Sequence, residues 1–392
     1  MDKSWSRGVR TAPLFVTLQG FAAGLGRLVL TPLSFTLLRQ LSDGDFHSGE
    51  DLAAKVGLTR ARVSQLLRQA ETAGLSLERV RGLGYRLKAA PDFLDAAAIR
   101  LALTGFGATV AKPGTPVPKP QVPVEEDLAL NGDVRPAFDR TPPALLVEVA
   151  DQLDSTSSEL LRRAPRRDIH GAVLAAEWQT AGRGRRGRSW TAVAGGSITF
   201  SRGWRFEQGA GFLAGLSLAV GVAVARALEK EGYDGIELKW PNDLVFRHHK
   251  LGGILIEVNG DALGPSTVVV GVGINARMPR EVRREIAQPV NDLQTVAGRG
   301  AKPVDRNRVL ARLIAEVASM LAAYAEHGFA PIAAEWQQRH AFQGKPVKLV
   351  LPDGGAVKGT VAGVDASGAL VLADGPRRSR FLSGELSLRR GV

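Results

Sequence analysis

The sequence has no cysteine, and this absence alone excludes several kinds of chemistry. It rules out disulfide bridges, zinc sites with thiolate ligands and a cysteine nucleophile. The six histidines are scattered, and none of them has the H-E-x-x-H spacing of a zinc-binding helix. No apolar run reaches the roughly 20 residues that a membrane-spanning helix needs. These absences fit a protein of the reducing cytoplasm, where we expect it to act without a membrane partner.

The 392 residues are enough for two or three domains, and 44% of them are hydrophobic, which is enough for a real core. The formal net charge of +12 indicates a polyanionic partner of some kind, although a generally Arg-rich surface is the simpler alternative. Residues 1–30 begin basic and then turn apolar, as a signal peptide does. Gln19, Gly20, Gly24 and Arg27 interrupt the apolar part, so we expect an N-terminal extension instead.

Residues 31–103 have the pattern of a winged helix-turn-helix domain. Helical periodicity over 31–42 precedes two short helices, the first starting with a capping box at Ser48 and ending at Gly57. Thr59 caps the second helix, which we expect to run to about residue 73. The stretch LSLERVRGLGYRLK alternates and turns at two glycines, which predicts a hairpin, and a further helix is expected near 92–102.

The second of these helices and the hairpin have side chains that suit DNA. Cations there can contact phosphates, while hydroxyl and amide side chains can reach base edges. A winged helix without DNA would instead serve interaction or dimerisation. The residues predicted to contact DNA are Thr59, Arg60, Arg62, Gln65, Arg68 and Arg81.

Three further segments complete the predicted organisation. Residues 104–143 form a linker crowded with proline, as in KPGTPVPKPQVPVEED, which is extended and semi-rigid. Residues 144–342 alternate strands and helices, which predicts an α/β domain with a sizeable mixed sheet. Residues 343–392 contain short strands with turn signals at regular spacing, which predicts a small SH3-like β-barrel.

Residues 182–190 read GRGRRGRSW and contain the G-x-G-x-x-G spacing of dinucleotide-binding loops. That fingerprint needs a helix to start within it and an acidic residue about 20 positions later. Here the strand-like GSITFS follows instead, so the dinucleotide interpretation fails on context. A flexible loop with four guanidiniums can fold over an anion, since arginine offers forked donors to carboxylate and phosphate. A solvated basic loop and a nucleic-acid arm are the alternatives.

Other polar side chains stand at the ends of expected strands and helices. In KWPND, Asn242 and Asp243 can hold a metal-phosphate group or a ribose, although Pro-Asn-Asp is also an ordinary turn sequence. Lys250 opens the next strand, where it can meet a carboxylate or a phosphoryl group. Residues 156–159 read as a capping box, and their hydroxyls can equally contact a ligand. The strand VGVGIN ends on Asn275.

In combination, GRGRRGRSW, KWPNDL, KLGGILIE and GVGIN resemble the motifs of the biotin protein ligases. The N-terminal domain resembles that of the bifunctional members, which also repress biotin synthesis genes. The resemblance covers about residues 31–103 and 144–392. It implies that biotin is activated with ATP and Mg²⁺ to biotinyl-5′-adenylate. Biotin then passes to a lysine of the biotin carboxyl carrier domain of acetyl-CoA carboxylase.

The resemblance also implies binding to operator DNA as a homodimer when the adenylate is bound. Two alternatives stay open: a biotin-sensing DNA-binding repressor with little ligase activity, and a lipoate-type acyl ligase on the same fold. The linker is longer and richer in proline than the family pattern, which would weaken the mechanical coupling between the ligase and the DNA-binding domain. The family's usual D-S-T-N also reads D-S-T-S here, which leaves the role of Ser157 open.

Site residues follow from the resemblance position by position. The catalytic residues would be Arg183, Lys250 and Asp243, with Asp243 also at the metal. Biotin would be bound by Ser155, Thr156, Gln179, Gly182, Arg183, Gly184, Arg185, Lys250 and Gly253. ATP would be bound by Arg185, Arg186, Trp190, Asn242, Asn275, Glu385 and Arg389.

Overall fold

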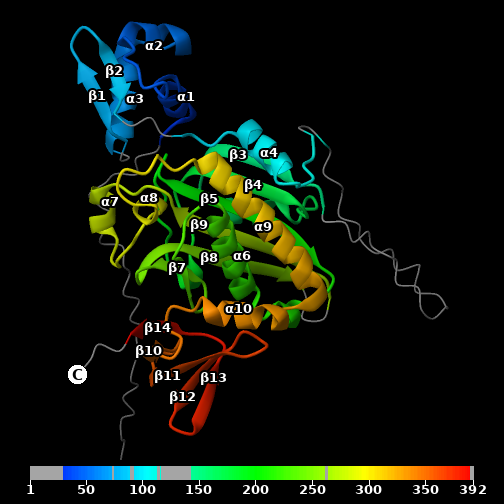
Figure 1. The fold of residues 1–392 in the computed structure, drawn as a ribbon. Helices are drawn as coiled ribbons and strands as arrows, with labels where there is room; N and C mark the ends of the chain where they lie inside the picture. The colour runs from blue at the N-terminus through cyan, green and yellow to red at the C-terminus, as the bar shows by residue number, and fades with distance from the viewer. Residues whose placement is uncertain are drawn as a thin grey trace, which may run out of the picture.

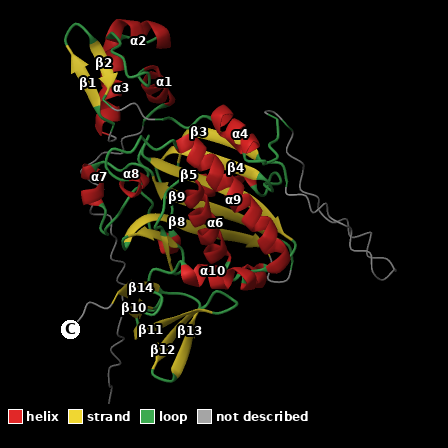
Figure 2. Cartoon of the chain, viewed as in Figure 1, coloured by secondary structure: helices red, strands yellow, loops and turns green. Residues whose placement is uncertain are grey.

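The computed structural model describes residues 30–72, 75–88, 92–112, 115, 143–260 and 264–388. The extension before residue 30, most of the proline-rich segment and Arg389 lie outside these residues. A central α/β body has an N-terminal unit at one end and a small C-terminal sheet at the other (Figures 1 and 2). No helix in the described part of the chain has the length and apolar character that crossing a membrane requires.

The N-terminal unit contains three helices and a two-stranded antiparallel hairpin, as the sequence predicted. The Ser48 hydroxyl accepts a hydrogen bond from the Asp51 backbone N–H and so caps the second helix, while Thr59 caps the third by accepting from Arg62. Apolar side chains from all three helices form one buried core. The elements are α1 (Pro32–Gln40), α2 (Gly49–Val56), α3 (Arg60–Thr72), β1 (Leu77–Val80) and β2 (Gly84–Leu87).

The central sheet has seven strands in the order β3-β4-β5-β9-β8-β7-β6. Only β3 and β4 pair in parallel, so the sheet is mixed, as predicted. The strands are β3 (Leu146–Leu153), β4 (Ala172–Gln179), β5 (Ser197–Phe206), β6 (Glu237–Lys239), β7 (Asp243–Phe246), β8 (His249–Gly260) and β9 (Ser266–Asn275).

Helices cover both faces of this sheet. In β9, Val268 and Val270 join the main core with α6 (Leu216–Lys230) and α9 (Arg306–His327), whereas Val269 packs with α5 (Thr156–Arg163) on the other face. The sequence of α6 is apolar around nearly its whole circumference, and the helix is buried accordingly. The smaller helices are α7 (Arg280–Glu285), α8 (Leu293–Ala297) and α10 (Ala333–Gln338).

The helix expected near 92–102 is α4 (Ala96–Gly105), which starts later because Asp95 caps it. It packs beside α9, and its Ile99 and Leu103 belong to the core of the central body (Figure 1). This helix therefore belongs with the α/β body, whereas the sequence placed it with the N-terminal unit.

The C-terminal part is a five-stranded antiparallel sheet in the order β13-β12-β11-β10-β14. Alternate residues of β10, Val347 and Leu349, are buried, while Lys348 between them is exposed. The indole N–H of Trp240 donates to the Gly368 carbonyl at 3.1 Å and joins this sheet to the central body. The strands are β10 (Pro346–Val350), β11 (Ala356–Val364), β12 (Leu370–Asp374), β13 (Arg377–Phe381) and β14 (Glu385–Leu388).

Candidate active site

One pocket in the central body collects nearly all the site residues that the sequence predicted. Its walls come from the start of α5, the ends of β4 and β9, the β6–β7 turn, β8, the arginine loop 182–190 and the start of β14. Gly182 lies in the loop but not on the wall, and Arg389 lies outside the described residues. The predicted residues that line it are Ser155, Thr156, Gln179, Arg183, Gly184, Arg185, Arg186, Trp190, Asn242, Asp243, Lys250, Gly253, Asn275 and Glu385.

The start of α5 brings two buried hydroxyls to the pocket wall. The helix cap is Ser155, whose hydroxyl accepts from the Ser158 N–H, so the capping box predicted from Thr156 to Glu159 is wrong. Ser155 still has an extended backbone, so Thr156 is the first helical residue and the helix starts one residue earlier than expected. Its backbone N–H donates to Gln179 Oε1 at 2.8 Å, and its hydroxyl lies 2.7 Å from that of Ser201.

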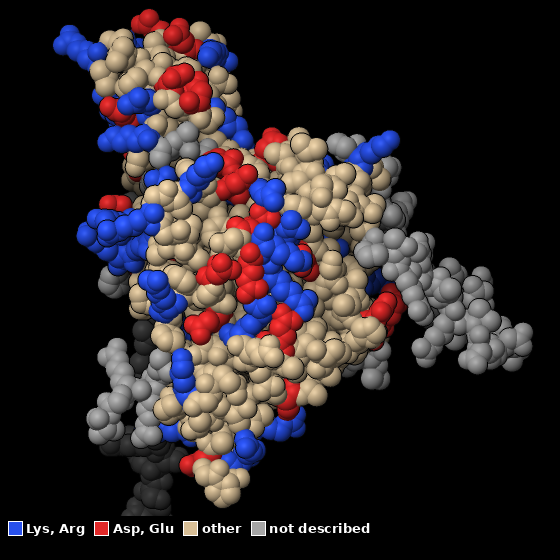
Figure 3. Space-filling view, viewed as in Figure 1, with Lys and Arg blue, Asp and Glu red and all other residues tan. Residues whose placement is uncertain are grey.

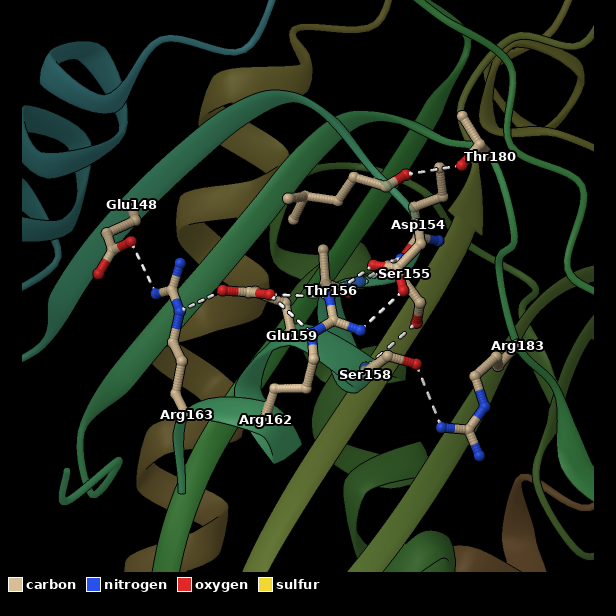
Figure 4. A network of polar contacts seen from close by, with 12 residues as sticks. Glu148, Asp154, Ser155, Thr156, Ser158, Glu159, Arg162, Arg163, Thr180 and Arg183 are labelled. Atoms are coloured by element: carbon tan, nitrogen blue, oxygen red, sulfur yellow. Dashed lines mark hydrogen bonds and ion pairs between the residues drawn. The ribbon is translucent and has the colours of Figure 1, made fainter. Parts of the chain in front are cut away.

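Several ion pairs lie along α5 and join its arginines to nearby carboxylates (Figure 4). Arg162 binds Asp154 at 2.8 Å and Glu159 at 2.7 Å, and Arg163 binds Glu148 at 2.8 Å. The hydrogen bond from Arg162 lowers the pKa of Asp154. Exposed pairs of this kind add little stability, so packing of the buried Leu160 holds the helix more firmly than they do.

The floor of the pocket contains Ser157, which the sequence did not assign and which contacts Ser201, a residue outside the lining. Their hydroxyls are 2.9 Å apart, and both side chains are buried. A Cβ added at Gly271 would lie only 2.6 Å from the Ser157 hydroxyl, so a larger residue there would displace this hydroxyl. The alternation of Ser197, Thr199 and Ser201 in GSITFS was a signal that these hydroxyls share one face of β5.

The arginine loop forms part of the pocket wall, and hydrogen bonds of its own backbone close it on itself. The Trp190 N–H donates to the Gly182 carbonyl at 2.8 Å, and the Gly184 N–H donates to the Arg188 carbonyl at 2.7 Å. Arg186 has a positive φ of 57° within a short 3₁₀ turn. A strand follows at Ser197, which confirms that no dinucleotide-binding helix starts in the loop.

The loop arginines have different partners. Arg183 pairs with Glu257 at 2.8 Å and donates to the Ser158 hydroxyl at 3.2 Å. Arg188 pairs with Glu385 of the C-terminal sheet, and this hydrogen-bonded pair lowers the pKa of the Glu385 carboxyl. Arg185 donates to Asn242 Oδ1 at 3.1 Å. Burial lowers the pKa of the Arg185 guanidinium, and the neighbouring charge of Arg186 lowers it further.

The KWPND segment is both a turn and a part of the site. It joins β6 to β7 and leads the chain from Lys239 to Asp243. Asn242 donates to the Ile254 carbonyl at 2.8 Å, which fixes its amide in the wall. Lys250 Nζ lies 2.7 Å from Asp243 Oδ1, and both side chains are only about one-fifth exposed.

Two buried polar atoms of residues that line the pocket have no hydrogen-bond partner among the described residues. They are the indole Nε1 of Trp190 and the Oδ1 of Asn275. The Trp190 ring lies against Gly273, where an added Cβ would come within 2.6 Å of it. Because buried polar groups are normally paired, these atoms mark a position for a polar ligand.

The described residues contain no group of three or more His, Asp or Glu side chains placed to hold a metal ion. Asp243, the predicted metal ligand, is already paired with Lys250. The site therefore has no cage of protein ligands, and a metal held there would depend on ligands from a bound nucleotide.

The residues predicted to contact DNA lie on α3 and on the hairpin. Arg62 is half-buried and donates to Gln65 Oε1 at 2.7 Å. The other five, Thr59, Arg60, Gln65, Arg68 and Arg81, are exposed. Figure 3 shows Lys and Arg side chains on the projecting N-terminal unit and a second group over α7, beside the pocket.

Comparison with known proteins assigns this fold and site. Residues 150–275 match the model of the biotin/lipoate A/B protein ligase family, and residues 342–389 match that of the biotin protein ligase C terminal domain. The chain is 33% identical over 359 residues to the bifunctional ligase/repressor BirA of Salmonella typhimurium, covering 92% of this chain and 98% of that relative. It is 37% identical over 251 residues to the biotin--[acetyl-CoA-carboxylase] ligase of Mycobacterium tuberculosis, covering 61% of this chain and 88% of that one.

Among solved structures, the biotin protein ligase from Aquifex aeolicus in complex with biotin and ATP superposes with a TM-score of 0.53 at 31% identity. The match covers 62% of this chain and 99% of that one. Fold and pocket thus define a ligase with a central mixed sheet and a C-terminal antiparallel sheet. The chain belongs to the biotin protein ligase family, and the similarity to bifunctional ligase/repressors extends over nearly its whole length.

Proposed function

We propose that this protein activates biotin with ATP to biotinyl-5′-adenylate and transfers the biotin to a lysine of a biotin carboxyl carrier domain. The observation that supports this most directly is the meeting of four separate sequence motifs on one pocket. The match of residues 342–389 to a biotin ligase C-terminal domain favours biotin over lipoate.

In the first step, a carboxylate oxygen of biotin attacks the α-phosphorus of ATP, a new P–O bond forms and pyrophosphate leaves. Negative charge builds up on the phosphoryl oxygens, so fixed cations in a water-poor site lower the barrier. Lys250 is the cation best placed to contact the reacting carboxylate and the α-phosphate, and its ion pair with Asp243 holds its ammonium in the pocket. Arg183 and Arg185 of the arginine loop, which also line the pocket, would contact the same phosphate oxygens.

We assign the biotin ring system to the hydroxyl-rich part of the pocket and the adenine to the part beside Trp190 and Asn275. Ser155, Thr156 and Gln179 offer hydrogen-bonding groups in the first part. Trp190 and Asn275 offer an aromatic face and an unpartnered carbonyl oxygen in the second. Asn242, Arg186 and Glu385 then border the phosphates. Mg²⁺, which neutralises phosphate charge when it is bound, would be held by the nucleotide with Asp243 as its protein ligand.

In the second step, the amine of the carrier lysine attacks the acyl carbon of the adenylate. An amide bond forms, the bond from that carbon to the phosphate oxygen breaks, and AMP leaves. The chain needs no nucleophile of its own, which is consistent with the absence of cysteine. The arginine loop would exclude water and protect the mixed anhydride from hydrolysis.

The test is a transfer assay with biotin and lipoate side by side. Purified protein is mixed with Mg-ATP and a biotin carboxyl carrier domain, and the mass of the carrier is followed. We expect a gain of one biotin and no gain from lipoate. Transfer of lipoate alone, or of neither acid to a carrier shown to be competent, would reject the proposal. Lys250→Ala should nearly abolish adenylate formation, whereas Lys358→Ala, on the exposed C-terminal sheet, should match wild type.

We also propose that the N-terminal unit is a winged helix-turn-helix that binds operator DNA as a homodimer when the adenylate is bound. The exposed cations of α3 and of the β1–β2 hairpin support this role, since each contact to a phosphate adds affinity that depends on salt. Titration of operator DNA with and without biotinyl-adenylate, at two salt concentrations, tests it. If the adenylate leaves both DNA affinity and the dimer population unchanged, the protein is a ligase without adenylate-controlled repression.

The proposed domains are the extension 1–30, the winged helix, the linker 104–143, the ligase domain 144–342 and the SH3-like barrel 343–392. The sequence predicted residues 31–103 for the winged helix; because Phe93 packs in the core of the N-terminal unit and α4 packs on α9, we propose that it ends at about Phe93 instead. A cytoplasmic location stays a prediction from the sequence.

A further inference from the structure

A fully buried ion pair lies outside the pocket and has no part in the chemistry proposed above. Glu177 on β4 is 0% exposed, and its Oε1 is 2.9 Å from Nη2 of Arg306, the first residue of α9, which is 2% exposed. Desolvating two charges costs more than most ion pairs recover, so an apolar pair would often serve stability as well. The buried pair at this point therefore indicates a role in positioning the segments that it contacts.

The carboxylate of Glu177 joins two segments that are distant in the sequence. Its Oε1 accepts from the Gly195 N–H at 2.6 Å, and its Oε2 accepts from the Leu94 N–H at 2.9 Å. Gly195 follows the arginine loop on the way into β5. Leu94 lies on the segment that leads out of the N-terminal unit. One side chain therefore fixes the trailing end of the loop and the exit from the N-terminal unit together.

Arg306 makes the same connection with its guanidinium. Its Nη2 donates to the Ser197 carbonyl at 2.8 Å, and its Nη1 donates to the Asp92 carbonyl at 2.7 Å. Ser197 follows the loop, and Asp92 precedes Leu94. Next to it, Asn307 donates to the Asp92 carboxylate at 2.9 Å and the Phe93 carbonyl at 3.0 Å and accepts from the Asp95 N–H at 2.8 Å. Within the described part of the chain it makes no hydrogen bond to the loop side.

Apolar packing joins the same two segments. Ala194, which directly precedes Gly195, is buried in the core of the N-terminal unit together with Phe93. The end of the loop therefore sits against the N-terminal unit on one side and on Glu177 on the other. A displacement of the 92–94 segment therefore takes Phe93 away from the core that it shares with Ala194, and Leu94 away from the Glu177 carboxylate.

We infer that Glu177 and Arg306 are positioning residues that couple the order of the arginine loop to the seating of the N-terminal unit. The inference rests on the proposed function, in which this loop closes over the adenylate. If seating the 92–94 segment stabilises the closed loop, then closing the loop stabilises the seated segment by the same free energy. Ligand in the pocket and the placement of the N-terminal unit are then linked through two side chains.

Trypsin can report on the order of the loop, because it cleaves after arginine and residues 183, 185, 186 and 188 are all arginine. We would measure cleavage within the loop by mass spectrometry in the full-length protein without ligand. Glu177→Gln exchanges one acceptor oxygen for an amide that cannot accept from a backbone N–H. We expect cleavage in the loop at least tenfold faster than in wild type, and faster release of biotinyl-adenylate.

Two further variants separate coupling from simple anchoring. Asn307→Ala loosens only the 92–95 segment, and we expect it also to accelerate cleavage in the loop, by a smaller factor. Glu316→Gln removes the ion pair between Lys230 and Glu316, which joins α6 to α9 and touches neither the loop nor the 92–95 segment. We expect this control to be cleaved at the wild-type rate.

If Asn307→Ala leaves cleavage in the loop unchanged while Glu177→Gln raises it, Glu177 only anchors the loop and the coupling is refuted. If neither variant changes the cleavage, both positioning roles are refuted. Thermal unfolding of each variant checks that the chain is folded, and Asn307→Ala carries the test if Glu177→Gln is not. Because cleavage requires no ligand, a protein that failed to bind biotin would show that failure separately.

Discussion

His340 gives the sharpest prediction about stability, because it is a buried imidazole next to the KWPND segment. Its ring lies 4.5 Å from that of Trp336 between centroids, and its backbone bridges to Leu238 in β6. Neither ring nitrogen has a hydrogen-bond partner of good geometry among the described residues. Burial lowers the pKa of His340 to about 4, against a smaller opposing effect of Gln343.

The direction and size of the effect follow from this pKa. The unfolded chain takes up a proton near pH 6.5, whereas the folded protein keeps the imidazole neutral down to about pH 4. Between these values the unfolded state binds more protons, so stability is full above pH 6.5 and falls as the pH drops. Each pH unit removes about 1.4 kcal/mol, which is about 2 kcal/mol between pH 6.5 and pH 5.

The assay is urea unfolding of wild type and His340→Phe at pH 7.5 and pH 5.0, followed by tryptophan fluorescence. Phenylalanine keeps a planar ring beside Trp336 but takes up no proton. We expect the free energy of unfolding of the variant, relative to wild type, to rise by about 2 kcal/mol at the lower pH. Substitution of the exposed His327 by Gln serves as the control. Parallel losses in wild type and His340→Phe would show that burial of this imidazole does not govern the acid response.

Three other substitutions test separate parts of the structure. Gly271→Ala pushes a Cβ against the Ser157 hydroxyl, and we expect the KM for biotin to rise at least tenfold; an unchanged KM would mean that biotin does not reach this floor. Arg202 is fully buried and lies over the Trp204 ring at 5.2 Å; its guanidinium nitrogens have no hydrogen-bond partner among the described residues, and burial lowers its pKa to about 9. Arg202→Met should therefore raise the free energy of unfolding by about 1–4 kcal/mol, and a fall in the melting temperature would contradict this. Glu385→Gln breaks an exposed ion pair, so the free energy of unfolding should change by less than about 1 kcal/mol while the KM for ATP rises several-fold. An unchanged KM for ATP would show that this contact has no part in nucleotide binding.

Local patterns in the sequence predicted most of the elements, and the errors came from choices that local patterns do not settle. Ser155 and Thr156 are both good helix caps, and only the turn after β3 decides that Ser155 is used. The helix near 92–102 could be recognised from its periodicity, but its packing on α9 depends on residues 200 positions away. The pairing of Arg188 with Glu385 spans 197 residues and could not be read from either motif alone.

The partners of the loop arginines divide them into two groups with different consequences for binding. Arg183 and Arg188 are paired with Glu257 and Glu385, so an anionic ligand that recruits them must displace a carboxylate and gains only the difference in free energy. Arg185 and Arg186 have no carboxylate partner within the described part of the chain, and burial together with the charge of Arg186 already lowers the pKa of Arg185. A phosphate placed beside these two would relieve an existing repulsion. The strongest electrostatic gain on binding ATP should therefore come from the middle of the loop, and its flanking arginines should mainly control whether the loop is open or closed.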